Sequence, residues 1–293
     1  MEDRIITYGG QAVIEGVLMR GQKGYAIAMR APDGGITVHT EPLASVYRSK
    51  ITKIPFLRGI ILLWDSLGLG MRALTISANT QSGEDEKLEG AALYLTLGTS
   101  LAFGVGLFFL LPAGLGGLAE RYLGWSPWLN NFAEGVLRLA LLVGYIWAIS
   151  FMPDVKRLFM YHGAEHKTIN AYEAGAELTP EEVAKYPIEH ARCGTAFLLT
   201  LVLLSILLFT ALGPLPLLWR LATRILFIPV LAGIAVEYIR WTANHLNSPF
   251  VRWLIAPNLA LQHLTTRTPD LAMLEVAIAS FQSMRKAEQE LAL

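Results

Sequence analysis

The segment TAFLLTLVLLSILLFTAL at 195–212 decides the class of fold, because it is almost continuously apolar and carries no charged residue. A helix that crosses a membrane needs roughly 20 predominantly apolar residues. Three further stretches meet or approach this requirement, at 91–118, 132–152 and 217–241. The sequence therefore predicts a mainly α-helical membrane protein with about four transmembrane helices in a lipid bilayer.

The composition supports a membrane protein and excludes other classes. Hydrophobic residues make up 53% of the 293 positions and charged residues 16%, whereas soluble proteins average roughly 45–50% and about 25%. The 24 Lys and Arg residues are balanced by 24 Asp and Glu residues, so no excess positive charge exists to bind nucleic acid through its phosphates. We therefore expect no nucleic-acid partner. A single cysteine, Cys193, excludes a fold stapled by internal disulfides.

Charged residues occur in two of the predicted spans. The second span contains Glu134 and Arg138, whose spacing of four places them on one helical face as an ion pair. This pair either stabilises the fold or lines a polar pathway. The fourth span begins with Arg220 and Arg224, so we expect its first turns at the membrane interface, with both side chains reaching toward the lipid headgroups.

The distribution of Lys and Arg predicts the orientation. Segments 1–92, 153–194 and 240–293 carry ten, five and five of these residues, whereas 120–131 and 213–224 carry one and two. Cytoplasmic segments are enriched in Lys and Arg, and four crossings return the chain to the side on which it started. We therefore expect both termini and the 153–194 connection in the cytoplasm. The function should lie there too, because the connections on the other side are short.

The chain divides into three predicted parts. Residues 1–53 form a small β-rich cytoplasmic unit, and 54–90 form an amphipathic interfacial helix with a linker. Residues 91–293 form the transmembrane domain, which includes the histidine-rich 153–194 connection and an amphipathic C-terminal helix that we expect beneath the bundle.

Local periodicity supports the first two parts. Tyr25, Ile27 and Met29 alternate with small or polar residues and lead into the turn-forming PDGG at 32–35, a pattern typical of a β-hairpin. Beyond Leu57, apolar residues recur every three or four positions, while charged residues fall on another side. The sequence therefore predicts a helix that lies in the headgroup plane or packs against the bundle.

Residues suited to chemistry are concentrated in the 153–194 connection, where HGAEH at 162–166 follows the pattern H-x-x-E-H. His162 and His166 lie one helical turn apart, so they can hold one metal ion. Glu165 beside them can accept a proton from a water molecule at that ion. Inverted zinc proteases carry the same pattern.

Three residues are candidates for the third ligand of the metal ion. Glu173 lies two turns beyond His166 on the same helical face, and His190 and Cys193 stand just before the third span. Imidazole and thiolate suit zinc, so we predict a divalent ion, zinc, as the cofactor. The alternative is a chance pattern, in which the histidines bridge polar groups and the cysteine is simply packed. The gathering of three of the six histidines and the one cysteine within 162–193 favours a metal site.

A glycine-rich segment, GGQAVIEGVLMRG at 9–21, opens the β-rich unit. Its glycines suit backbone positions with positive φ or a close approach to another segment. It lacks the glycine spacing of a nucleotide-binding loop. Glu15 within it is either an exposed or ion-paired strand residue or a site residue that faces the membrane domain.

The chain resembles the YqhQ family, which consists of bacterial multi-pass membrane proteins described as predicted metal-dependent enzymes. The resemblance covers nearly the whole chain. It implies a location in the bacterial inner membrane, and it marks Glu165 and Glu15 as candidate catalytic residues and His162, His166, Glu173, His190 and Cys193 as candidate metal ligands. The segments that carry it, in order, are GGQAVIEGVLMRG (9–21), HGAEHKTINAYEAG (162–175), HARCGT (190–195) and LTTRTPDLAMLEVAI (264–278).

Two functions are compatible with these patterns. The first is a membrane-embedded, metal-dependent hydrolase that acts on a membrane-associated substrate at the cytoplasmic face. The second is a non-enzymatic membrane scaffold or small transporter with a structural histidine cluster. Transport is the weaker form of the second, because few polar residues lie inside the predicted spans.

Overall fold

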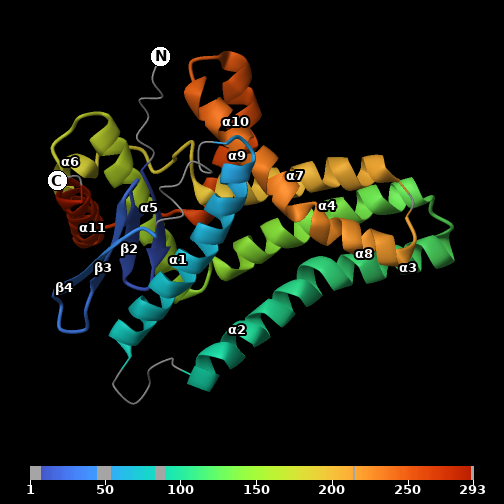
Figure 1. The fold of residues 1–293 in the computed structure, drawn as a ribbon, viewed down its shortest axis with the longest axis horizontal. Coiled ribbons are helices and arrows are strands. Elements are labelled where there is room, and N and C mark those ends of the chain that lie inside the picture. The colour runs from blue at the N-terminus through green and yellow to red at the C-terminus, as the bar shows by residue number, and fades with distance from the viewer. Residues whose placement is uncertain (1–7, 45–53, 83–89, 214, 292–293) are drawn as a thin grey trace.

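The computed structural model describes residues 8–44, 54–82, 90–213 and 215–291 of the 293-residue chain. These ranges form a unit of sheet and helices, from which a group of long helices extends (Figure 1). The mainly helical architecture with an N-terminal sheet confirms the predicted fold class.

Four antiparallel strands form the sheet in the order β1-β2-β3-β4. The PDGG segment makes the turn between β3 and β4, where Gly34 donates its backbone N–H to Ala31. The β-rich N-terminal unit expected from the alternation is therefore confirmed. The strands are β1 (Gly9–Val13), β2 (Gly16–Arg20), β3 (Gly24–Arg30) and β4 (Ile36–Pro42).

Helices cover both faces of the sheet, which explains why large and small residues alternate in β3. The large side chains at 25, 27 and 29 pack with α1 (Leu57–Gln81). On the opposite face, the alanines at 26 and 28 allow α5 (Pro153–Glu173) and α11 (Leu271–Glu290) to approach closely. Strands β2 and β3 are therefore buried on both faces and form the centre of the unit, whereas β4 at the edge of the sheet is largely exposed.

Helix α1 is the predicted amphipathic helix, and it joins the sheet to α9 (Ile228–Asn244). Arg58 near its start forms an ion pair with Glu237 of α9, with 2.6 Å between Nε and Oε1. On its outer side Trp64 is 76% exposed. An exposed tryptophan on such a helix is typical of the headgroup region of a membrane.

Within the described ranges, four helical stretches are long and apolar enough to cross a membrane, so the chain is a multi-pass membrane protein. The first combines α2, the π-helical η4 and α3, and the fourth combines the end of α8 with α9. The predicted number and positions of the spans are confirmed. The elements are α2 (Gly90–Val105), η4 (Gly106–Leu110), α3 (Leu111–Leu123), α4 (Pro127–Ile149), α7 (Gly194–Leu212), α8 (Leu217–Leu226) and α9.

Charged residues inside the spans bind one another. The expected pair between Glu134 and Arg138 of α4 is confirmed, with 2.9 Å between Oε1 and Nη2. The expectation that Arg224 reaches toward the headgroups is wrong, because this residue is 8% exposed and its Nη2 lies 2.7 Å from Oε2 of Glu134. The Glu134 carboxylate offers Arg224 a charge-assisted hydrogen bond inside the bundle. The side chain of Arg220 lies outside the described part of the chain.

Three further helices lie outside the spans besides α1 and α5. Helix α6 (Pro180–Val183) follows α5, and α10 (Pro249–Thr265), which contains Pro257, was not among the predicted helices. Asp270 caps α11 by accepting the backbone N–H of Met273 at 2.8 Å. Helix α11 packs against the sheet and α5, whereas the sequence favoured a place beneath the bundle. The first and last elements of the chain therefore form one unit.

A close contact joins α5 to the segment between α10 and α11. A Cβ at Gly163 would lie 2.2 Å from the backbone oxygen of Arg267. The backbone N–H of Arg267 also donates to the oxygen of Phe159 at 2.9 Å. Glycine at position 163 thus lets this segment run directly against α5.

We expect Gly163→Ala to destabilise the protein, although alanine normally favours a helix over glycine by roughly 0.5–1 kcal/mol. The added methyl group would overlap a backbone oxygen, and overpacking of this kind costs about 1–3 kcal/mol. Gly68→Ala in α1 is the control, because nothing lies within 4 Å of an added Cβ there. Thermal unfolding in detergent should give a lower midpoint for Gly163→Ala and an unchanged or higher one for Gly68→Ala. Equal midpoints would contradict the contact.

Candidate metal centre

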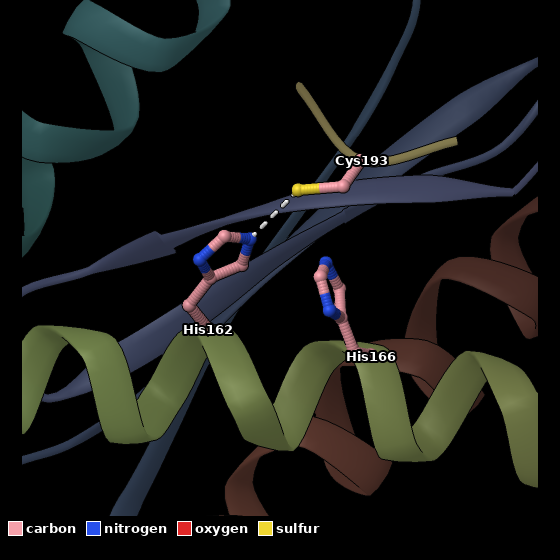
Figure 2. A group of neighbouring side chains, drawn as sticks. All are labelled: His162, His166 and Cys193. Carbon is pink, nitrogen blue, oxygen red and sulfur yellow. Dashed lines mark hydrogen bonds between the residues drawn. The ribbon is translucent and has the colours of Figure 1, made fainter. Parts of the chain in front are cut away.

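Three side chains that could bind a metal converge between α5 and the start of α7 (Figure 2). His162 and His166 project from α5 toward Cys193, and the potential ligand atoms all lie within 4.8 Å of one another. The closest pair is Nε2 of His162 and Sγ of Cys193, at 3.2 Å. His166 and Cys193 are buried, at 1% and 5% exposed.

Backbone oxygens determine which ring nitrogen of each histidine carries the proton. Nδ1 of His162 lies 2.8 Å from the oxygen of Thr265, and Nδ1 of His166 binds the oxygen of Ile188. A carbonyl oxygen can only accept a hydrogen bond, so both Nδ1 atoms are protonated and both Nε2 atoms present a lone pair. Metal-binding histidines typically have this arrangement, in which the outer nitrogen donates to a fixed acceptor.

The Nε2 atom of His166 is buried and has no hydrogen-bond partner in the described structure. A buried nitrogen lone pair without a partner is destabilising. The ligand atoms of the other two members of the cluster lie within 4.8 Å of it. The residues present therefore fit a metal ion, which would satisfy this atom together with Nε2 of His162 and Sγ of Cys193.

Cys193 occupies the N-cap position of α7, where its sulfur accepts the backbone N–H of Thr195 at 3.4 Å. The hydroxyl of Thr195 lies 3.1 Å from the same sulfur. Free N–H groups at a helix N-terminus favour negative charge, which suits a thiolate that binds a metal. One residue thus begins a membrane span and faces the two histidines.

The connection between α6 and α7 is held in place by three polar side chains. Lys167 and Asn170 of α5 donate to backbone oxygens in 184–189, and the side-chain amide of Gln262 binds both backbone groups of His190. These bonds position the oxygen of Ile188 and the sulfur of Cys193. None of the three side chains was a predicted site residue, although Lys167 and Asn170 lie in the same motif as the histidines.

Glu165 lies beside the cluster and faces β1. It is 5% exposed, and a Cβ at Gly10 would lie 2.9 Å from its side chain. Burial raises the pKa of Glu165 to about 7, against the opposing effects of His162 and of a hydrogen bond from the backbone of Gly10. The glycine-rich segment therefore allows the strand to approach the carboxyl group closely.

Glu173 and His190 lie next to the cluster and contact each other. Glu173 forms an ion pair with Arg192, and its Oε2 lies 3.8 Å from Nε2 of His190. Burial raises the pKa of Glu173, but His190 and Arg192 outweigh this effect and the net pKa is lowered. Burial also lowers the pKa of His190, whose ring lies 5.6 Å from that of His166. Neither residue is among the three whose ligand atoms converge.

Glu15 lies in the turn between β1 and β2, where its φ is 53°. Both carboxylate oxygens bind Arg157 of α5 at 2.6 Å, and the hydroxyl of Tyr161 lies 3.2 Å away. The hydrogen bond from Arg157 lowers the pKa of Glu15. The structure thus places Glu15 in an ion pair that joins the sheet to α5, apart from the three converging side chains.

We expect Glu15→Gln to lower the stability of the protein at neutral pH by roughly 0.5–1 kcal/mol, since the ion pair is partly exposed. Because folding lowers the pKa of Glu15, its contribution is complete above the ordinary glutamate pKa of about 4.3. The contribution is lost as the pH falls through the lowered value. Thermal midpoints of the natural protein and the variant should therefore differ near pH 7 and converge once the pH falls below the lowered pKa of Glu15. A difference that persists in acid would show that Glu15 acts in another way.

Comparison with known proteins identifies a family for this chain, and the descriptions of that family and of a relative name no activity. Residues 54–287 match the family described as protein of unknown function (DUF1385). The chain is also 35% identical over 297 residues to the uncharacterized protein YqhQ of Bacillus subtilis (strain 168), across 96% of this chain and 93% of YqhQ. No solved structure matches the chain. The resemblance carried by four sequence motifs is thereby confirmed, and the chain belongs to the DUF1385 family as a homologue of YqhQ.

Proposed function

We propose that the protein is a membrane-embedded hydrolase that uses a divalent metal ion, zinc, at His162, His166 and Cys193. The observation that carries this proposal is the convergence of two Nε2 atoms and one Sγ atom, with Nδ1 of each histidine bonded to a backbone oxygen. The buried, unpartnered Nε2 of His166 supports it further.

The set of donor atoms favours zinc in a catalytic role. Two imidazole nitrogens and one thiolate are ligands that zinc prefers. Structural zinc sites are closed by four protein ligands, whereas three protein ligands leave one position for water or substrate. When bound, the ion supplies Lewis acidity and makes a water molecule acidic enough to act as a nucleophile near neutral pH.

Glu165 is the group that we expect to accept the proton from the attacking water. Its carboxyl group is buried next to His162, and the backbone N–H of Gly10 holds it. Its position in the pattern H-x-x-E-H matches that of the proton acceptor in inverted zinc proteases. Glu173, His190 and Arg192 form a neighbouring polar group that can help to orient a substrate at this site.

The location of the site supports a membrane-associated substrate. Cys193 directly precedes the span α7, and α5 begins shortly after the span α4 ends at Ile149. The Lys and Arg residues on the site-bearing segments favour the cytoplasmic face of the bacterial inner membrane. A lipid, a membrane-bound isoprenoid or a membrane peptide is therefore the proposed substrate class.

The first test is metal analysis by elemental mass spectrometry of protein purified in detergent without chelator. We expect about one zinc ion per chain, lost in His166→Ala and Cys193→Ala. His39→Ala, which removes an exposed histidine of β4, should retain the metal. If the natural protein contains no metal, even after zinc or manganese is added, the metal-dependent proposal fails, which leaves a non-enzymatic scaffold or a reaction without metal.

A second test separates metal binding from proton transfer. Glu165→Gln should keep its zinc but lose hydrolysis by about 100-fold or more, because loss of a general base typically has an effect of this size. Product release can be followed by mass spectrometry after incubation with membrane vesicles from bacteria that lack the protein. Glu181→Gln, at an exposed glutamate of α6, is the matched control. Full activity in Glu165→Gln would exclude this residue as the base.

One observation favours a second candidate, in which Cys193 is a nucleophile. Nε2 of His162 lies 3.2 Å from its sulfur, and Thr265 orients the ring, as in cysteine–histidine pairs. His162 would take the thiol proton while the sulfur bonds to an acyl carbon, and the leaving group would receive that proton. Water would then hydrolyse the thioester and restore the thiol. His166 has no part in this reaction, so an active, metal-free His166→Ala variant would favour it.

A further inference from the structure

A second buried polar cluster lies inside the membrane spans, apart from the metal centre. It consists of Glu134 and Arg138 of α4 and Arg224 of α8, which are 2%, 7% and 8% exposed. Oε1 of Glu134 lies 2.9 Å from Nη2 of Arg138, and Oε2 lies 2.7 Å from Nη2 of Arg224. One carboxylate therefore binds two guanidinium groups.

The charges of this cluster do not balance. Arginine remains protonated in proteins, so two positive charges face one negative charge. In the ranges that the structure describes, the ion pairs of Arg138 and Arg224 all end on Glu134. An excess positive charge among apolar helices is costly. The described residues thus leave one positive charge of this cluster without a negative partner.

Hydrogen bonds to backbone oxygens hold two polar side chains, Arg138 and Asn131, in place at the cluster. Arg138 donates its Nε to the oxygen of Phe108 at 2.9 Å, and Phe108 belongs to the π-helical segment η4. π-helical turns are rare and occur frequently at functional sites. The amide of Asn131 binds the oxygens of Phe209 and Gly213 at 3.2 and 2.8 Å. Asn131 and Ser205 line a narrow gap beside the charged residues that is closed to a water molecule, so a ligand can enter only where these side chains move apart.

We propose that Arg138 and Arg224 together bind one singly charged phosphate group within the membrane. The planar guanidinium fork matches the oxygens of a phosphate and can donate two parallel hydrogen bonds to it. A single negative charge would neutralise the cluster while Glu134 holds the two arginines near each other. The phosphodiester of an anionic phospholipid and inorganic phosphate share this chemistry. The proposal does not depend on the metal centre or on the proposed hydrolase activity.

Thermal unfolding of the delipidated, full-length protein in a neutral detergent tests this binding. Phosphatidylglycerol should raise the midpoint of the natural protein by about 5 °C at a hundredfold excess over Kd, whereas phosphatidylcholine should not. Arg224→Gln leaves a neutral pair of Glu134 and Arg138, so it should lose this shift. Arg121→Gln, at an exposed arginine of α3, is the matched control and should retain it.

Sodium phosphate, compared with sodium chloride at equal ionic strength, distinguishes the two sources of the ligand. A shift with phosphatidylglycerol alone identifies a lipid headgroup, and a shift with sodium phosphate identifies a free anion. Native mass spectrometry provides a readout that does not depend on stability, since the natural protein should retain a bound lipid or phosphate that Arg224→Gln lacks. No shift and no bound anion in the natural protein, or equal shifts in the natural protein and Arg224→Gln, would overturn the proposal.

Discussion

The structure depends on one constraint, which is that a polar helix is buried on all sides. Every residue from 163 to 169 of α5 is buried, and this stretch includes a glutamate, a histidine, a lysine and a threonine. Buried polar groups are stable only when they are hydrogen-bonded. The sheet, α11 and the two connections around α5 supply the backbone groups that meet this requirement. Among the buried side-chain nitrogen and oxygen atoms of α5, Nε2 of His166 alone has no hydrogen-bond partner. The three side chains that could bind a metal converge at this atom.

Much of the fold could be predicted from local patterns, because its elements carry strong periodicities. The four spans, the hairpin of β3 and β4, and the starts of α5 and α11 follow from apolar runs, alternation, turn residues and caps. What could not be predicted involves contacts between segments that are distant in sequence. Arg224 turns inward to a carboxylate 90 positions away, and α11 covers a sheet made by the first residues of the chain. No local pattern specifies such partners.

In the candidate site, too, local contacts could be predicted from the sequence and contacts between distant segments could not. The spacing of His162 and His166 places them on one helical face, so their proximity could be predicted. Which of Glu173, His190 and Cys193 lies against the two histidines could not be predicted, because it depends on the path of the connection before α7. Lys167, Asn170 and Gln262 fix that path by donating hydrogen bonds to backbone oxygens. Every residue has a backbone oxygen, so the sequence does not show which of them will accept such bonds. Glu173 lies two turns along the same helix, yet its carboxylate binds Arg192.

The packing of α11 on the sheet also determines when this protein can become complete during synthesis. The strands leave the ribosome before the four spans, and α11, which covers one of their faces, leaves after all four. Until then the alanine face of the sheet has no cover from α11, so membrane insertion must precede the closure of this unit. The sheet and α11 therefore close into one unit only after the segment that holds all four spans has been synthesised.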